Sequence, residues 1–210
     1  MFYFIKTPWW LKKWYSRLVW DIPVREKVLY LTFDDGPHPE ATPFVLDELK
    51  KAGAKATFFC IGKNVQAYPQ IYRRILLEGH RIGNHTQNHL NGWKTPDQQY
   101  LEDIRKASLS IDSNLFRPPY GRISAFQSTW LRAAPFHYTI IMWDVLSADF
   151  DRRLTAQKCA RYVIQHARPG SIVVFHDSEK ALDRLRGALP AVLQHFGEKG
   201  YRMEGIVKTE

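Results

Sequence analysis

Two adjacent carboxylates, Asp34 and Asp35, end an apolar stretch of the sequence. Aromatic and β-branched residues predict a buried strand over 28–33, and the Gly-Pro pair after the carboxylates predicts its end. Where a strand runs into a tight turn, both carboxylates can face one site, one holding a metal and the other accepting a proton. Asp is also common in turns and helix caps, so a purely structural role stays open.

His85 and His89 form a second cluster with chemical potential. Their spacing of four residues predicts one helical turn that places both imidazoles on the same side. Two His and one carboxylate make an open metal site, with positions left for water and substrate. Helix capping or simple solvation would explain the two His equally well.

Arg117 and Tyr120 are separated by Pro118 and Pro119. The prolines fix the backbone and remove two N–H donors, which leaves a rigid loop presenting an Arg, a Tyr and the N–H of Tyr120. Such an N–H suits an oxyanion that develops during a reaction. The alternative is a stiff connecting loop.

The last cluster follows two further apolar stretches. Trp143 ends the first, and Asp149 and Phe150 come shortly after it; Val174 and His176 end the second. A His at a strand end is a candidate general acid, and a nearby Asp would keep it protonated and oriented. Either His176 or Asp149 could instead be a capping residue.

The elements that must position these clusters alternate along the chain. Strands are predicted over 28–33, 56–60, 80–84, 114–117, 138–144, 171–175 and 201–207, and helices near 41–52, 65–77, 97–111, 125–134, 155–167 and 180–198. This alternation predicts an α/β fold, a distorted (β/α) barrel of about seven parallel strands with right-handed crossovers. Chemistry in such barrels lies at the carboxyl ends of the strands, where the clusters fall.

Composition limits the class of protein. The chain has 210 residues, of which 45% are hydrophobic, and we expect one well-cored domain over 27–210 after an extension at 1–26. The net charge of +9 favours an acidic partner such as an anionic membrane or a charged cell-wall polymer. Lys and Arg are scattered, so we predict no nucleic-acid binding. Two cysteines give neither a disulfide framework nor a Cys-based zinc site.

The extension contains four of the seven Trp together with four basic residues within 1–20. From Trp9 on, one helical face carries Trp10, Leu11, Trp14 and Leu18. Such a segment could lie in a membrane interface, which predicts a weak membrane contact, or it could pack on the barrel. We find neither a signal-peptide core nor an apolar run long enough to span a membrane, and we expect a cytoplasmic or membrane-surface-associated monomer.

Taken together, the motifs within 27–207 resemble those of the polysaccharide deacetylases with a NodB-homology domain, carbohydrate esterase family four, in the family's order. The resemblance implies a role for each candidate residue: catalytic Asp34 (the general base), Arg117, Asp149 and His176 (the general acid); metal ligands Asp35, His85 and His89; and substrate or oxyanion contacts Pro119, Tyr120, Trp143, Phe150 and Val174.

The activity implied by this resemblance is metal-dependent removal of N-acetyl groups from an N-acetylglucosamine-containing glycan, similar to peptidoglycan or chitin, with release of acetate. Nitrogen and oxygen ligands suit zinc, and cobalt or nickel could replace it. Two positions depart from the family pattern: Phe150 stands where Trp is usual and Val174 where Leu is usual. Both are expected to line the pocket for the acetyl methyl. A different acyl substrate, such as an O-acetyl ester, and a non-catalytic wall-binding module remain alternatives.

Overall fold

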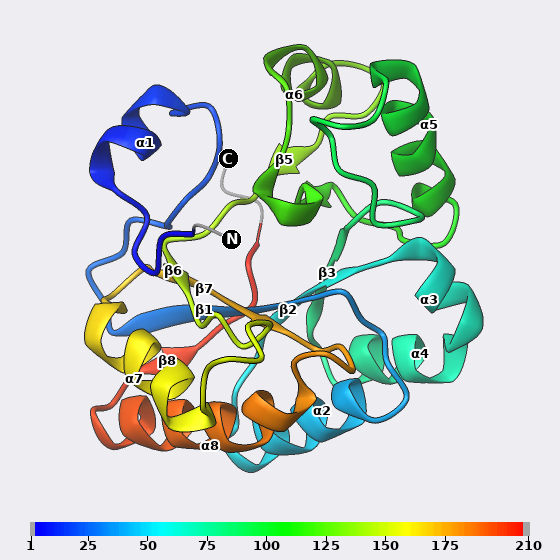
Figure 1. Cartoon of the computed structure of the whole chain (residues 1–210). Coiled ribbons are helices and arrows are strands. Elements are labelled where there is room, and N and C mark those ends of the chain that lie inside the picture. The colour runs from blue at the N-terminus through cyan, green and yellow to red at the C-terminus, as the bar shows by residue number, and fades with distance from the viewer. Residues whose placement is uncertain (1–2, 208–210) are drawn as a thin grey trace.

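The computed structural model describes residues 3–207, and its strands form one curved sheet (Figure 1). The strands are β1 (Val28–Asp34), β2 (Thr57–Cys60), β3 (Arg81–Asn84), β4 (Leu115–Phe116), β5 (Thr139–Ile140), β6 (Val145–Leu146), β7 (Ile172–His176) and β8 (Arg202–Met203). Their order is β5-β4-β3-β2-β1-β7-β6, with β8 paired to β1, and all the pairs are parallel. The predicted α/β fold is confirmed as seven parallel strands curled into a half-barrel.

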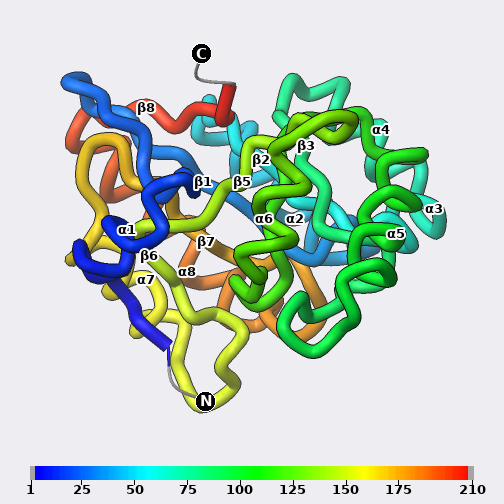
Figure 2. The backbone as a smooth tube through the Cα atoms, turned by 90° about the horizontal axis from the view of Figure 1, so that it is seen from above, coloured from blue at the N-terminus to red at the C-terminus, as the bar shows by residue number. Residues whose placement is uncertain are grey.

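Helices surround the sheet, as the view from above shows (Figure 2). They are α1 (Trp9–Trp14), α2 (Ala41–Lys51), α3 (Gly62–Ala67), α4 (Pro69–Leu77), α5 (Asp97–Ser108), α6 (Ala125–Arg132), α7 (Ala156–His166) and α8 (Leu182–Glu198), with a short 3₁₀ helix, η1 (Pro119–Gly121). No helix within 3–207 is both long and apolar enough to cross a membrane.

The central strand β1 fixes the register on which the site depends. All seven of its residues are buried. Phe33 stacks on Phe58 of β2 and on Phe175 of β7, with ring centroids 5.1 and 6.0 Å apart. These rings are also partners in the strand register, and the next pair along it joins Asp34 to His176. Apolar stacking on one face of the sheet therefore places two polar side chains together at its carboxyl edge.

Several predicted elements are shorter in the structure, among them the strand at 201–207, which is only Arg202–Met203, and two others differ by an additional element. The helix predicted at 65–77 is two helices, because Pro69 has no N–H to donate and begins a new helix at that point. The strand predicted at 138–144 is shorter, and a second strand, β6, follows it. The chain between β5 and β6 crosses from one edge of the sheet to the other, which a continuous apolar pattern does not reveal.

The N-terminal segment lies between these two edges of the sheet. On the β6 side, Lys6 bridges to Val145, and the Thr7 N–H donates to the Asp144 carbonyl at 2.9 Å. On the β5 side, Val19 bridges to Ile141. Edge strands expose unpaired backbone groups, so the segment supplies partners to both open edges of the half-barrel. The domain boundary predicted at residue 26 stays a prediction.

A buried carboxylate anchors this segment. Asp144 is fully buried and pairs with Lys6 at 2.5 Å and with Lys12, while Ser171 donates a third hydrogen bond at 2.5 Å. Trp20 is also buried, with 8% of its surface exposed. The packing interpretation therefore holds for the end of the segment and for two of its lysines.

Deleting residues 1–20 should lower the free energy of unfolding by about 3–5 kcal/mol, the usual cost of removing the partners of a buried charge. Asp144 would lose both lysines, and the sheet edges would lose their backbone partners. Denaturant unfolding measures the loss. Lys13→Ala is the matched control, because this lysine is exposed. Unchanged stability of the truncated protein would show that the segment is an appendage.

Candidate active site

Five of the predicted site residues meet at the carboxyl edge of the sheet. Asp34 ends β1 and His176 ends β7, while His85 directly follows β3 and Arg117 directly follows β4. Asp35 follows β1 and turns towards the His85 side. Parallel strands end at one edge of a sheet, which explains why residues far apart in sequence converge.

Asp35, His85 and His89 form a compact cluster whose candidate ligand atoms all lie within 4.8 Å of one another. Asp35 Oδ1 lies 3.6 Å from Nε2 of His85 and 3.1 Å from Nε2 of His89. The helical turn predicted for the two His is wrong, because the segment after β3 is a loop. His89 reaches the cluster through a left-handed backbone conformation with φ of 58°.

The donor set of this cluster fits a divalent cation. Asp35 Oδ1 is buried and has no hydrogen bond of normal geometry, despite its two imidazole neighbours. The Nδ1 of His85 lies 2.7 Å from the Arg117 carbonyl, which fixes the proton there and leaves the Nε2 lone pair facing the carboxylate. Burial, with the charge of His89, lowers the pKa of His85 to about 4, so its imidazole is neutral, as a ligand must be.

Asp34 is held by a buried arginine. Arg117 is fully buried and donates to Asp34 Oδ1 at 2.7 Å and to the Thr32 hydroxyl at 2.6 Å. Its other N–H groups donate to the carbonyls of Ile141 and Met142. Burial lowers the pKa of Arg117 and the Asp34 charge opposes that shift, so a guanidinium remains charged at pH 7. No described group hydrogen bonds to Asp34 Oδ2, which stays free to accept a proton.

His176 is paired with a buried acid in the predicted manner. Asp149 is fully buried and lies 2.7 Å from His176 Nδ1 through one oxygen, and its second oxygen accepts the His176 N–H at 2.8 Å. Burial opposes protonation, but the charge and hydrogen bond of Asp149 prevail and raise the pKa of His176 to about 9. The imidazole is therefore protonated at pH 7, with Nε2 unpartnered among residues 3–207.

The predicted contact residues lie around these groups. Phe150 sets its ring edge-on against His176 at 5.2 Å, and Tyr120 contacts the His89 ring at 4.6 Å. Trp143 packs so tightly against Gly121 that a Cβ there would lie 2.6 Å from the indole. Val174 is buried two residues before His176 and so shares its face of the sheet. Pro119 is buried in η1.

Two supporting acids were missed by the sequence reasoning. Asp103 of α5 accepts the N–H groups of Gln87 and Asn88, each at 2.9 Å, and so fixes the loop that carries His89. Asp177 accepts the Gly36 N–H and the hydroxyl of Thr42 behind the turn that carries Asp35. Burial, together with the charge of Asp35, raises the pKa of Asp177 well above its usual range. Asp103 lies on an amphipathic helix and Asp177 directly follows His176. Neither position has a sequence pattern that would have indicated its supporting role.

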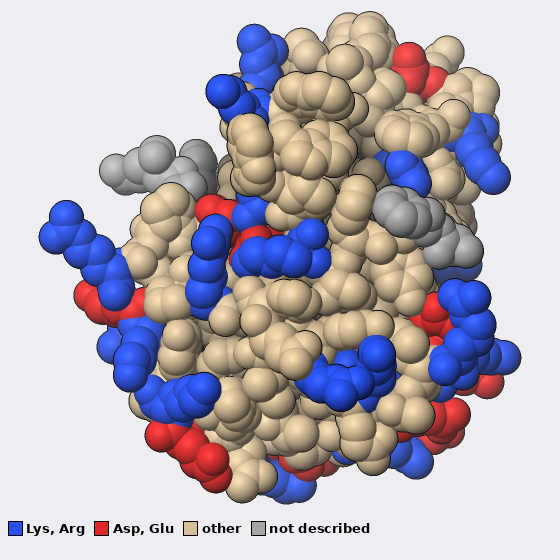
Figure 3. All heavy atoms as spheres, turned by 60° about the vertical axis from the view of Figure 1, so that its left-hand side comes forward, with Lys and Arg blue, Asp and Glu red and all other residues tan. Residues whose placement is uncertain are grey.

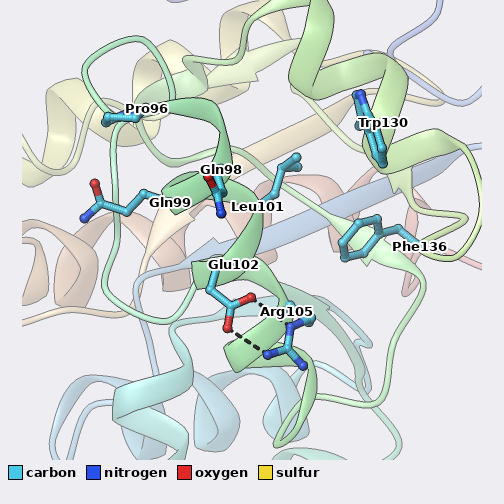
Figure 4. Close-up of a pocket in the computed structure, with 8 residues that line it drawn as sticks. All are labelled: Pro96, Gln98, Gln99, Leu101, Glu102, Arg105, Trp130 and Phe136. Carbon is cyan, nitrogen blue, oxygen red and sulfur yellow. Dashed lines mark hydrogen bonds and ion pairs between the residues drawn. The ribbon is translucent and has the colours of Figure 1, made fainter.

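A hollow of about 640 Å³ lies elsewhere, between α5 and α6 (Figure 4). Trp130, Phe136 and Leu101 supply its apolar lining, and an ion pair between Glu102 and Arg105 lies at one end. None of the predicted site residues lines it. The chemical groups are therefore concentrated at the sheet edge rather than in this hollow.

Comparisons with known proteins agree with this geometry. The family described as "Polysaccharide deacetylase" matches residues 21–139. A peptidoglycan-N-acetylglucosamine deacetylase from Bacillus cereus is 34% identical over 190 residues, covering 88% of this chain and 89% of the relative. A chitooligosaccharide deacetylase from Azorhizobium caulinodans is 32% identical over 208 residues, covering 88% and 95%.

A solved structure extends the similarity to nearly the whole chain. The Bc1960 peptidoglycan N-acetylglucosamine deacetylase superimposes with a TM-score of 0.85 at 33% identity, covering 95% of each chain. The chain therefore belongs to the polysaccharide deacetylase family, hydrolases of carbohydrate esterase family four.

Replacing one candidate ligand tests the metal site. His89→Ala should lower metal affinity at least about 10–100-fold, the effect typical of losing even an outer partner of a ligand. Metal content after dialysis, by elemental analysis, measures this loss. His166→Ala on the exposed end of α7 should keep full metal content. A His89→Ala protein with the parental stoichiometry would remove His89 from the ligand set.

Proposed function

We propose that the protein removes N-acetyl groups from N-acetylglucosamine units of a glycan such as peptidoglycan, releasing acetate and a free amine. One observation carries this proposal: a metal-ligand cluster, a tethered carboxylate and a protonated His–Asp pair converge at one edge of the sheet. The names of the relatives support a glycan substrate.

Asp35, His85 and His89 would hold the metal, most suitably zinc, with cobalt or nickel as substitutes. When bound, the ion would polarise the acetamide carbonyl and lower the pKa of a bound water. Asp34 accepts a proton from the attacking water at Oδ2, and Arg117 keeps this carboxylate oriented.

The remaining groups act on the two ends of the breaking bond. The Tyr120 N–H donates to the oxygen of the tetrahedral intermediate, because η1 holds this residue with φ of 61°. His176 gives its Nε2 proton to the leaving amine while Asp149 stabilises the imidazolium. Phe150 and Val174 supply apolar surface beside His176 for the acetyl methyl.

Acetate release tests the proposal against its alternatives. We would supply peptidoglycan, N-acetylglucosamine oligomers, acetylxylan and simple acetate esters side by side and measure acetate. Release from the first two supports the N-deacetylase. Release from esters alone would favour an O-acetyl substrate, and glycan binding without release from any of them would favour a non-catalytic wall-binding module.

Substitution of the two neighbouring carboxylates should have two different effects. Asp34→Asn should keep metal and lose turnover by about 10²–10⁴-fold, the usual contribution of a general base. Asp35→Asn should instead lose metal, because its Oδ1 belongs to the ligand cluster. Metal content and turnover are measured on folded protein, since Asp34→Asn also weakens the pairing of buried Arg117. The reverse pattern would exchange the two roles.

The His176–Asp149 pair predicts a pH dependence. Because the pKa of His176 is raised to about 9, activity should fall on the alkaline side near that pH. The same pair stabilises the fold fully below about pH 6.5, and this stability is lost as pH rises through about 9. Asp149→Asn should move the alkaline limb of activity to lower pH. If the alkaline limb did not move in this variant, the loss of activity at high pH would come from the titration of another group.

We also propose that α1 makes a weak contact with an anionic membrane. None of the α1 residues is buried, and Trp9 and Trp14 are 74% and 76% exposed. Figure 3 shows this side of the molecule, with Lys and Arg side chains spread over it. Lys13 and Arg17, close to these Trp in the sequence, are exposed, whereas the other two basic residues of the segment pair with Asp144. Two free cations would contribute only about 2 kcal/mol.

Substituting the exposed rings separates membrane contact from packing. Trp9→Ala combined with Trp14→Ala should abolish binding to phosphatidylserine vesicles and leave the melting temperature unchanged, because both indoles are exposed. Trp20→Ala, at a buried indole, should lower the melting temperature and serves as the contrast. Vesicle sedimentation at low and high salt gives the readout. Equal vesicle binding by the double variant would contradict a role for α1.

A further inference from the structure

Trp93 and Arg122 form a stacked pair between the two loops that carry His89 and Tyr120. The guanidinium carbon lies 4.2 Å from the centre of the indole ring. The indole N–H donates to the Ile123 carbonyl at 2.9 Å, and 58% of the Trp93 surface remains exposed. Stacking on an aromatic face is a preferred arrangement for the planar guanidinium. The pair thus presents an apolar ring and an oriented cation together.

Both residues follow closely on candidate catalytic positions. Trp93 comes four residues after His89 in the same loop, and Arg122 comes two residues after Tyr120. The rings of His89 and Tyr120 are themselves in contact, with centroids 4.6 Å apart. A glycan whose acetamide lies at the metal cluster would therefore extend over this pair with a neighbouring sugar.

The two loops are locked together rather than loosely apposed. Gly92 approaches the Arg122 carbonyl so closely that a Cβ would lie 2.5 Å from it. Gln127 is fully buried and donates to the Gly92 carbonyl at 2.8 Å, while it accepts the Ser124 N–H at the start of α6. These contacts hold Trp93 and Arg122 in place before a ligand binds, which reduces the entropic cost of binding.

The Arg122 guanidinium contacts the Trp93 ring but has no ionic partner in the described part of the chain. Among residues 3–207, no carboxylate forms an ion pair with its guanidinium, and no described group accepts a hydrogen bond from it. By contrast, Arg117 is paired with Asp34 and Arg105 with Glu102. Carboxylates pair with arginine through two parallel hydrogen bonds, so the unused N–H groups suit an external carboxylate.

We propose that Trp93 and Arg122 form a subsite for a carboxylate-bearing sugar, such as a muramic acid unit whose carboxyl carries no peptide, next to the sugar that loses its acetyl group. The inference rests on the proposed deacetylase function and deepens it. The indole stacks on the sugar ring, and the guanidinium pairs with the carboxylate. A neutral chitin-like strand could use the ring alone, so the pair favours an acidic glycan over a neutral one.

Equilibrium binding tests the subsite without turnover. We would titrate de-N-acetylated tetrasaccharides whose muramic carboxyl is either free or converted to its amide, using calorimetry. The parent protein should bind the free acid about tenfold more tightly, as expected for a charge-assisted hydrogen bond. Arg122→Gln should bring this ratio close to one, and Arg122→Lys should give an intermediate ratio, because a lysine keeps the charge without the planar stack. High salt should also reduce the ratio.

Arg73→Gln on α4 is the control, since it removes an exposed charge away from these loops and should keep the parental ratio. Equal affinity of the parent protein for both glycans would overturn the subsite, as would equal losses for both in Arg122→Gln at an unchanged melting temperature. Acetate assays on the acetylated glycans run in parallel. Selective binding without acetate release would refute the deacetylase proposal alone, and release without selectivity would refute the subsite alone.

Discussion

The buried pairing of Arg117 with Asp34 is the constraint on which the site depends. A charge in a fully buried position is costly unless its hydrogen-bonding groups are satisfied. Arg117 meets that condition by donating to Asp34, to Thr32 and to two carbonyls in the stretch after β5, and it also lies 4.1 Å over the ring of Phe59. One side chain thus joins the ends of several strands, and the carboxylate it holds has little freedom to move.

Backbone strain is concentrated around the same point. Asp35, His89 and Tyr120 all have positive φ, at 81°, 58° and 61°, which costs a non-glycine residue of order 1–3 kcal/mol each. The surrounding contacts hold two of these conformations in place: Asp177 binds the turn after Asp35, and Asp103 binds the loop before His89. The strained backbone therefore lowers the stability of the fold, but it orients two candidate metal ligands and an N–H group that a relaxed backbone would direct elsewhere.

The sequence was informative where local patterns decide structure and less so where distant contacts do. The alternation of strands and helices predicted the sheet, and polar residues at strand ends predicted which side chains meet. The conformation between His85 and His89 was mispredicted because Asp103, distant in sequence, sets it. The position of the N-terminal segment depends on Asp144, whose bonds to lysines more than a hundred residues away leave no local pattern.

The proposed catalytic groups would act on the acetyl end of any glycan that the site accepts. Discrimination between glycans must therefore come from the residues around these groups. Phe150, where the family usually has Trp, is proposed to line the pocket for the acetyl methyl beside His176. The start of the described chain lies beside the loop between β6 and α7 (Figure 2). The Tyr3 ring packs edge-on against Phe150 at 5.3 Å, and its hydroxyl donates to Asp151 at 2.7 Å. Since Phe150 in turn contacts His176, the N-terminal segment supports the wall beside the proposed general acid. A segment that pairs the sheet edges thus also packs against one wall of the proposed pocket.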